Sequence, residues 1–230
     1  MSNVICLAGL SNSGKSTSLK YLDPKETFII SCTSKQLQIP GFRKKYIKTK
    51  VEDGKLTGNW LVSNKYDQIE KVMKNISKTR PSCKVIVLDD CNYLLSNETF
   101  QNAMVKGYEK FTTLAKNYYD LIQTCQELRD DITVVFISHI ENIGTEIDPE
   151  YRLWTTGKML TNAINLDGLF SYIIYAERYV DDKDDNVRYR FKVHTDGNDT
   201  CRSVAGCFED KYIEPNMKLV IDTINQFENE

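Results

Sequence analysis

A glycine-containing stretch near the start of the chain carries residues suited to holding phosphate groups. The sequence GLSNSGKST, residues 9–17, fits the spacing G-x-x-x-x-G-K-[ST]. Gly9 and Gly14 allow backbone conformations in which successive N–H groups converge on a phosphate. Lys15 would reach the outer phosphates, and the Ser16 hydroxyl would complete the coordination of Mg²⁺. We therefore expect this chain to bind a nucleoside triphosphate, ATP, together with Mg²⁺.

The segments on either side supply the context that such a loop needs. The apolar run at residues 4–8 (VICLA) is typical of a buried strand, and residues 17–22 can begin a helix. The free N–H groups and the dipole at the start of that helix would favour negative charge. A glycine-rich turn without a ligand is the alternative interpretation. The residues expected to contact the nucleotide are Gly9, Leu10, Ser11, Asn12, Ser13, Gly14, Lys15, Ser16 and Thr17.

Two acidic residues follow a second apolar run. Residues 84–88 (KVIVL) lead directly into Asp89 and Asp90. A carboxylate at the end of a strand beside the phosphate loop can hold Mg²⁺ through water, and Asp89 fits that role. Asp90, one residue later, is placed like the acid that orients or deprotonates the attacking water in ATPases. An ordinary acidic turn after a strand is the alternative for both residues.

A third apolar run, residues 132–139 (ITVVFISH), ends in Ser138 and His139. Polar residues at this point are well placed to sense the γ-phosphate, while a strand-end histidine without such a role is the alternative. The catalytic candidates are therefore Lys15, Asp90, Ser138 and His139. The irregular polar stretch that follows, residues 141–156, lies where α/β folds place ligands.

Residues 34–63 are polar and contain turn signals at 40–41 and 53–54, which predict an inserted hairpin over residues 38–62. Basic residues interleaved with aromatics can hold a nucleic-acid strand by phosphate contacts and base stacking. A solvated hairpin whose charged edges prevent aggregation is the alternative. The candidate contacts to single-stranded DNA are Arg43, Lys44, Lys45, Tyr46 and Lys48, with Lys50 and Trp60 nearby.

The remaining pattern predicts how these residues are positioned. Helical periodicity marks residues 66–79, 94–129 and 215–227, and a further strand at 170–176 is joined by a charged turn to an alternating one. Strands that alternate with helices predict an α/β fold whose mostly parallel sheet is covered on both faces, a three-layer α/β/α arrangement. We expect one domain, residues 1–230, that ends in a β-hairpin and helix over 170–227.

Composition limits the partners. The chain has 230 residues, 41% hydrophobic and 27% charged, and a net charge of −2 with a pI near 5.8, so any nucleic-acid contact must be a local patch. Seven scattered cysteines without a C-x-x-C pair, and no recognisable signal peptide, favour a reducing cytoplasm. No apolar run approaches membrane-spanning length, and two histidines give little material for a metal site.

The motifs GLSNSGKST, VIVLDD, VVFISH, RLWTTGKML and FSYIIYAE, in this order, resemble the RecA-like P-loop ATPases. Within that class they look like the small phage-encoded ATPases associated with single-strand annealing and recombination. The resemblance spans residues 4–227. It implies a RecA-type core, assembly into rings or filaments, and ATP-dependent action on single-stranded DNA in the host cytoplasm, with a recombination or replication partner. The strand at 27–32, between the phosphate-loop unit and the Asp89 strand, suits ATPases in which another strand separates these elements.

The sequence departs from the pattern at one catalytic position. Many RecA-like ATPases end the second strand with a glutamate base; residues 31–34 here read SCTS, so the base role passes to Asp90. Many such ATPases also take a cation from a neighbouring subunit. Lys158 or Arg152 can fill that role, with solvated loop charges as the alternative. Two other functions stay open: a nucleotide or small-metabolite kinase, although no arginine-rich lid is evident, and a nucleotide-switched adaptor such as a helicase loader.

Overall fold

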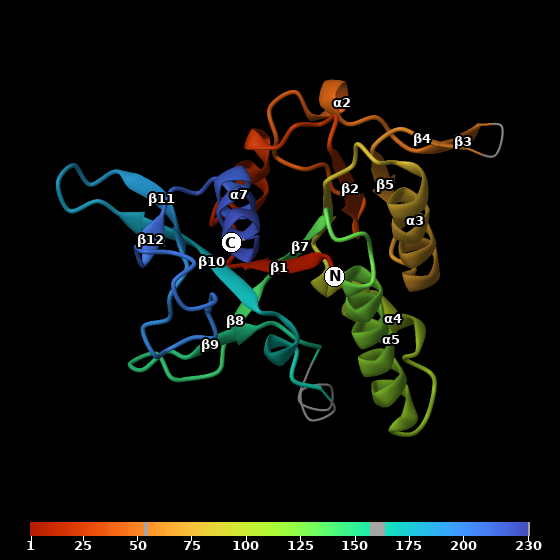
Figure 1. Cartoon of the computed structure of the whole chain (residues 1–230). Helices are drawn as coiled ribbons and strands as arrows, with labels where there is room; N and C mark the ends of the chain where they lie inside the picture. The colour runs from red at the N-terminus through yellow and green to blue at the C-terminus, as the bar shows by residue number, and fades with distance from the viewer. Residues whose placement is uncertain (53–54, 157–163, 230) are drawn as a thin grey trace.

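The computed structural model describes residues 1–52, 55–156 and 164–229 (Figure 1). Within these residues an eight-stranded sheet forms the centre of a mixed α/β fold. The strand order is β12 (Tyr212–Ile213), β11 (Val187–Lys192), β10 (Tyr172–Val180), β1 (Asn3–Ala8), β7 (Thr133–Ser138), β6 (Val85–Asp89), β2 (Thr27–Ser31) and β5 (Trp60–Val62). Neighbouring strands from β10 to β5 run parallel, and β11 and β12 are added antiparallel at one edge. The sheet is therefore mostly parallel, as predicted.

The central strands are buried on both faces. Apart from Asn3, every residue of β1, β7, β6 and β2 is buried. This burial explains why these segments are continuous apolar runs rather than alternating ones. The strand predictions at residues 4–8, 27–32, 84–88 and 132–139 are each confirmed to within one residue at either end.

Helices pack on both faces of the sheet. One core cluster lies beneath α3 (Tyr66–Thr79), α4 (Asn92–Gln101) and α5 (Glu109–Gln126). A second cluster lies beneath α7 (Met217–Glu228) and the short helices η1 (Leu19–Tyr21) and α2 (Phe42–Lys45). The predicted helices at 66–79 and 215–227 are confirmed. The stretch predicted as helical at 94–129 is divided between α4 and α5, where Gly107 adopts a left-handed backbone with φ of 95°.

The pairing of β7 brings the predicted motifs to one edge of the sheet. β7 lies between β1 and β6, with Ser138 level with Ala8 and Phe136 level with Leu88. Because the three strands are parallel, their carboxyl ends meet at the same edge. The strand at residues 27–32, which comes between β1 and β6 in the sequence, lies instead on the far side of β6.

The segment predicted as an inserted hairpin, residues 38–62, is only partly a hairpin. β3 (Lys50–Glu52) and β4 (Lys55–Thr57) do pair antiparallel, while the turn at 53–54 lies outside the described residues. However, the chain forms α2 before them, and β5 after them joins the main sheet beside β2. The prediction of one hairpin over the whole of residues 38–62 is wrong because aromatic side chains before β3 and after β4 pack on the core. Phe42 lies 5.2 Å from Tyr46 and 5.0 Å from Trp60 between ring centroids.

Two further hairpins flank the sheet. β10 and β11 form the C-terminal hairpin that the sequence predicted. β8 (Ile140–Asn142) and β9 (Tyr151–Leu153) form a small hairpin that takes up most of residues 141–156, a stretch expected to be irregular. Across the described ranges, no helix combines the length and the apolar composition needed to cross a membrane.

The core of this fold predicts a large difference between two phenylalanine substitutions. Phe136 on β7 is fully buried against Phe170 and Tyr118, whereas Phe100 on α4 is 75% exposed. Phe136→Ala should lower the free energy of unfolding by about 3–5 kcal/mol because it leaves a cavity. Phe100→Ala should change it by less than about 0.5 kcal/mol. Urea denaturation of both variants provides the measurement, and equal losses would contradict the assignment of β7 to the core.

Candidate functional site

The structure explains why both fixed positions of the phosphate-loop spacing, Gly9 and Gly14, are occupied by glycine. Gly14 has φ of 90°, a left-handed conformation that side chains rarely adopt. At Gly9, an added Cβ atom would lie 2.5 Å from the backbone oxygen of Ala176 on β10. The loop therefore turns sharply at Gly14 and packs closely against β10 at Gly9.

The helix after the loop is shorter than expected. α1 (Lys15–Ser18) contains four residues and continues only as the 3-10 turn η1 to Tyr21. A dipole argument for anion binding therefore has little weight here, because the helix is about one turn long. The N–H groups of the loop and the side chain of Lys15 remain as the donors.

Lys15 is buried in the loop. Its Nζ donates to the backbone oxygens of Gly9 and Leu10, at 2.7 and 2.8 Å. Burial lowers the pKa of Lys15 to about 8, although Asp90 and Asp89 act in the opposite direction. The ammonium group is thus largely desolvated, which is an arrangement that a bound phosphate would relieve.

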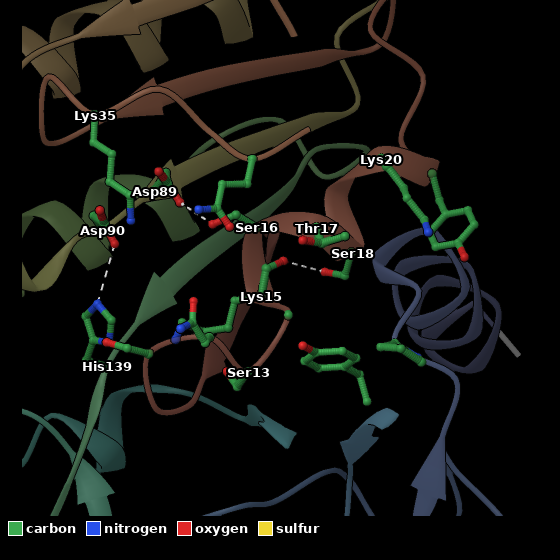
Figure 2. Close-up of a pocket in the computed structure, with 17 residues that line it drawn as sticks. Ser13, Lys15, Ser16, Thr17, Ser18, Lys20, Lys35, Asp89, Asp90 and His139 are labelled. Atoms are coloured by element: carbon green, nitrogen blue, oxygen red, sulfur yellow. Dashed lines mark hydrogen bonds and ion pairs between the residues drawn. The ribbon is translucent and has the colours of Figure 1, made fainter. Parts of the chain in front are cut away.

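Asp89 lies beside the loop and is almost fully buried. Ser16 Oγ donates to Asp89 Oδ1 at 3.5 Å, although the two residues are 73 positions apart (Figure 2). Burial, followed by the charge of Asp90, raises the pKa of Asp89 to about 7. A buried carboxylate beside a hydroxyl offers the hard oxygen donors that Mg²⁺ prefers.

The donor set matches a metal that is bound together with its substrate. Among the described residues, no group of three or more His, Cys, Asp or Glu side chains is arranged to hold a metal ion. Mg²⁺ in nucleotide sites keeps several waters and takes one or two protein ligands plus phosphate oxygens. Ser16 and Asp89 therefore fit Mg²⁺ that arrives with a triphosphate.

Asp90 is held in an uncommon backbone conformation. Its φ of 57° is left-handed, which costs energy for a residue with a side chain. His139 Nε2 lies 3.6 Å from Asp90 Oδ1, and Thr33 Oγ1 donates to Oδ2 at 3.4 Å. The contact with His139 is the main reason that the pKa of Asp90 is below its usual value. Asp90 is therefore an ionised, oriented carboxylate.

Asn92 ties the end of β7 to its surroundings. Its Oδ1 accepts hydrogen bonds from Ser138 Oγ at 3.0 Å and from the His139 N–H at 2.6 Å. Its Nδ2 donates to the Trp154 backbone oxygen at 2.9 Å. Of the two residues predicted to sense phosphate, only His139 faces the cavity, because the hydroxyl of Ser138 is buried and turned to Asn92. Ser138 is thus placed as a positioning residue.

These groups surround a cavity of about 440 Å³. Figure 2 shows Asp90 and His139 on one side of the loop and Lys20 on the opposite side, with Ser16, Thr17 and Ser18 between them. The cavity brings together most of the predicted site. Its lining comprises Ser11, Asn12, Ser13, Gly14, Lys15, Ser16, Thr17, Ser18, Lys20, Tyr21, Lys35, Gln38, Asp89, Asp90, His139, Tyr189 and Pro215.

Several lining residues were not predicted, and Lys35 is the most informative. Its ammonium group points toward Asp89 and Asp90 in Figure 2, and its charge lowers the pKa of both carboxyls. A usable signal existed, because Lys35 follows the carboxyl end of β2, and ligands bind at that edge of parallel sheets. Tyr189, on β11, had no comparable signal.

Other predicted residues lie outside the cavity. Arg152 Nε pairs with Glu141 Oε1 at 2.9 Å within the β8–β9 hairpin, and Lys158 lies outside the described residues. Arg43, Lys44, Lys45 and Lys48 are exposed. Tyr46 is only 2% exposed, so its predicted contact with DNA bases is wrong: the ring is part of the core.

Comparison with known proteins adds no family assignment. No protein-family model matches this chain, and no curated protein matches it at a significant level of similarity. The site is therefore interpreted from the geometry of its own residues, and the resemblance drawn from the motifs remains a prediction.

The hydrogen bonds of Asn92 predict its role. Asn92→Ala would leave the Ser138 hydroxyl and the His139 N–H without their acceptor, which should lower the free energy of unfolding by about 1–3 kcal/mol. It should also shift the amide resonance of His139 in a two-dimensional NMR spectrum. Asn117→Ala, which removes one partly buried bond to Glu98, is the control and should leave that resonance in place. An unmoved His139 resonance in Asn92→Ala would contradict the positioning role.

Proposed function

We propose that this chain is a Mg²⁺-dependent ATPase. The observation that carries the proposal is the meeting of Ser16 and Asp89, 3.5 Å apart, beside the buried ammonium group of Lys15. Lys15 and Ser16 are adjacent in the phosphate loop, while Asp89 lies 73 positions after Ser16; together they supply the cation, hydroxyl and carboxylate that a triphosphate–Mg²⁺ site needs. This arrangement supports the proposal over an unliganded turn or an ordinary acidic loop.

The strand order supports a RecA-like P-loop fold as part of the proposal. In the order β10-β1-β7-β6-β2, one strand separates the phosphate loop from the Asp89 strand. We infer a three-layer α/β/α ATPase domain over residues 1–230, with the C-terminal hairpin and helix as its last elements.

The roles of the residues follow from their positions. ATP with Mg²⁺ supplies the phosphoanhydride bond and the divalent charge. In the proposed reaction, the loop N–H groups and Lys15 would hold the outer phosphates, and Ser16 and Asp89 would hold the metal. Asp90 accepts a hydrogen bond from the attacking water and orients it. Its pKa below the usual value suits orientation better than early proton removal, as does a transition state with little bond formation to water.

Lys35 is the proposed cation from the same chain. Its charge already faces both carboxylates, so it is well placed to offset charge on the departing phosphoryl group. Arg152 is engaged by Glu141 in its own hairpin, which makes it the weaker candidate for the cation. Assembly into a ring or filament remains a proposal that rests on the family resemblance.

Turnover of ATP tests the catalytic assignment. Lys15→Ala and Asp90→Asn should each lower kcat by about 100-fold or more, because each removes a group needed at the reacting phosphate. Lys116→Ala and Asp120→Asn, on the exposed surface of α5, are matched controls and should leave turnover unchanged. Chelation of Mg²⁺ should abolish hydrolysis. Normal turnover by Asp90→Asn would contradict its role, and wild-type nucleotide affinity in Lys15→Ala would contradict the site itself.

We further infer that the ATPase acts on single-stranded DNA in phage-type recombination or replication. The support is the family resemblance together with four exposed cations on and just after α2: Arg43, Lys44, Lys45 and Lys48. Because Tyr46 is buried, this surface would bind phosphates rather than stack bases. Binding should therefore depend strongly on salt.

Salt dependence tests the DNA surface. The triple substitution of Lys44, Lys45 and Lys48 by Ala should weaken binding to single-stranded DNA and reduce the slope of log K against log salt by about 2, since each lost phosphate contact contributes ~0.7. A triple substitution of the exposed Lys71, Lys74 and Lys78 on α3 is the control. Equal effects of the two triple substitutions would contradict the assignment of the DNA-binding surface. If single-stranded DNA does not change the rate of ATP hydrolysis, the DNA role is contradicted, while the ATPase proposal is unaffected.

A further inference from the structure

We propose that the part of the cavity beyond the phosphate loop is a purine-base subsite with Tyr189 as its stacking platform. The inference rests on the proposed function, because the same cavity would hold the triphosphate. It assigns a role to the C-terminal hairpin, which the phosphate-loop motif does not include.

The direction of the cavity fixes where a base would lie. Asp90 and His139 occupy one side of the loop, and Lys20 occupies the opposite side (Figure 2). The reacting phosphate belongs beside Asp89 and Asp90, so the sugar and base must extend the other way. The cavity lining includes Tyr21, whose ring lies beside the Lys20 ammonium, Pro215, and Tyr189, which lies against Gly14 at the end of the loop.

Tyr189 connects the hairpin to the loop. A Cβ atom added at Gly14 would lie 3.2 Å from Cδ1 of Tyr189, so the ring packs directly on the backbone of the loop. The side chain is nevertheless 44% exposed and lines the cavity. One part of the ring therefore rests on the loop, and another part is available to a ligand.

The cavity lining also includes a second aromatic ring and a proline ring. The Lys20 ammonium lies 4.7 Å from the centroid of the Tyr21 ring, and the Tyr21 hydroxyl donates to Glu214 Oε1 at 3.3 Å. Pro215 follows directly. Two partly exposed aromatic rings and a proline ring offer surfaces for a flat heterocycle, and the larger stacking area of a purine favours it over a pyrimidine.

Binding of ATP and of inorganic tripolyphosphate, which has no base, separates this subsite from the phosphate site. By calorimetry with Mg²⁺, Tyr189→Ala should weaken ATP binding roughly 5- to 150-fold, the range for loss of one stacking contact. It should change tripolyphosphate binding by less than about twofold, because the base contributes nothing there. Tyr189→Phe should keep the affinity for both ligands. Tyr119→Ala, at a residue of similar exposure (41%) on α5, is the matched control.

A second variant guards against damage to the loop. Tyr21→Ala changes a ring on another element and should also weaken ATP selectively, with CTP affected less than ATP. If Tyr189→Ala weakens the binding of ATP and tripolyphosphate equally, or if Tyr21→Ala changes the binding of neither, the proposal of a base subsite is wrong. If the wild type binds neither ATP nor tripolyphosphate, and Lys15→Ala behaves identically, the proposed function itself is overturned.

Discussion

The pairing of β7 with both β1 and β6 sets the geometry on which the site depends. Ser138 is level with Ala8, the last residue before the loop, and the Cys91 N–H donates to the Ile137 oxygen just after the acidic pair. A slip of one residue in either register would turn every side chain to the opposite face of the sheet. Since both faces of these strands are buried, such a slip would force each side chain into a part of the core shaped for a different one. The packing of the core therefore also fixes the distance between Ser16 and Asp89.

A ligand that the chain itself does not supply would stabilise the charged groups at this edge of the sheet. Burial lowers the pKa of Lys15 and raises that of Asp89, so desolvation disfavours the charged form of each group, and the opposite charges nearby offset this only in part. A metal and a polyphosphate would supply one partner for each. The left-handed backbone of Asp90 also costs free energy. Contacts of its carboxylate with Thr33 and His139 help to hold this conformation. The edge of the sheet is thus costly in the free chain and suited to a ligand.

Local sequence patterns predicted the local structure well, but they did not predict which distant segments come into contact. The spacing of Gly9, Gly14 and Lys15 and the apolar run before Asp89 depend on neighbouring residues, so the sequence shows them directly. The burial of Tyr46 depends on which surface its segment packs against. The basic residues next to it in the sequence indicated an exposed side chain instead. Tyr189 lies on an alternating strand that looks ordinary until the sheet order brings it over the loop. Hydrophobic periodicity does not show which strands become neighbours in a sheet.

The contacts of the loop with β10 and β11 also bear on how the chain acquires its shape. Gly9 rests on the Ala176 carbonyl and Gly14 on the Tyr189 ring, yet both partners are made long after the loop during synthesis. Contacts of such sequence separation form late, because a large loop must close first. A nascent chain that ended before β10 would contain the whole phosphate-binding motif without the support that shapes it. The proposed competence to bind a triphosphate would then arise only after β10 and β11 have been made.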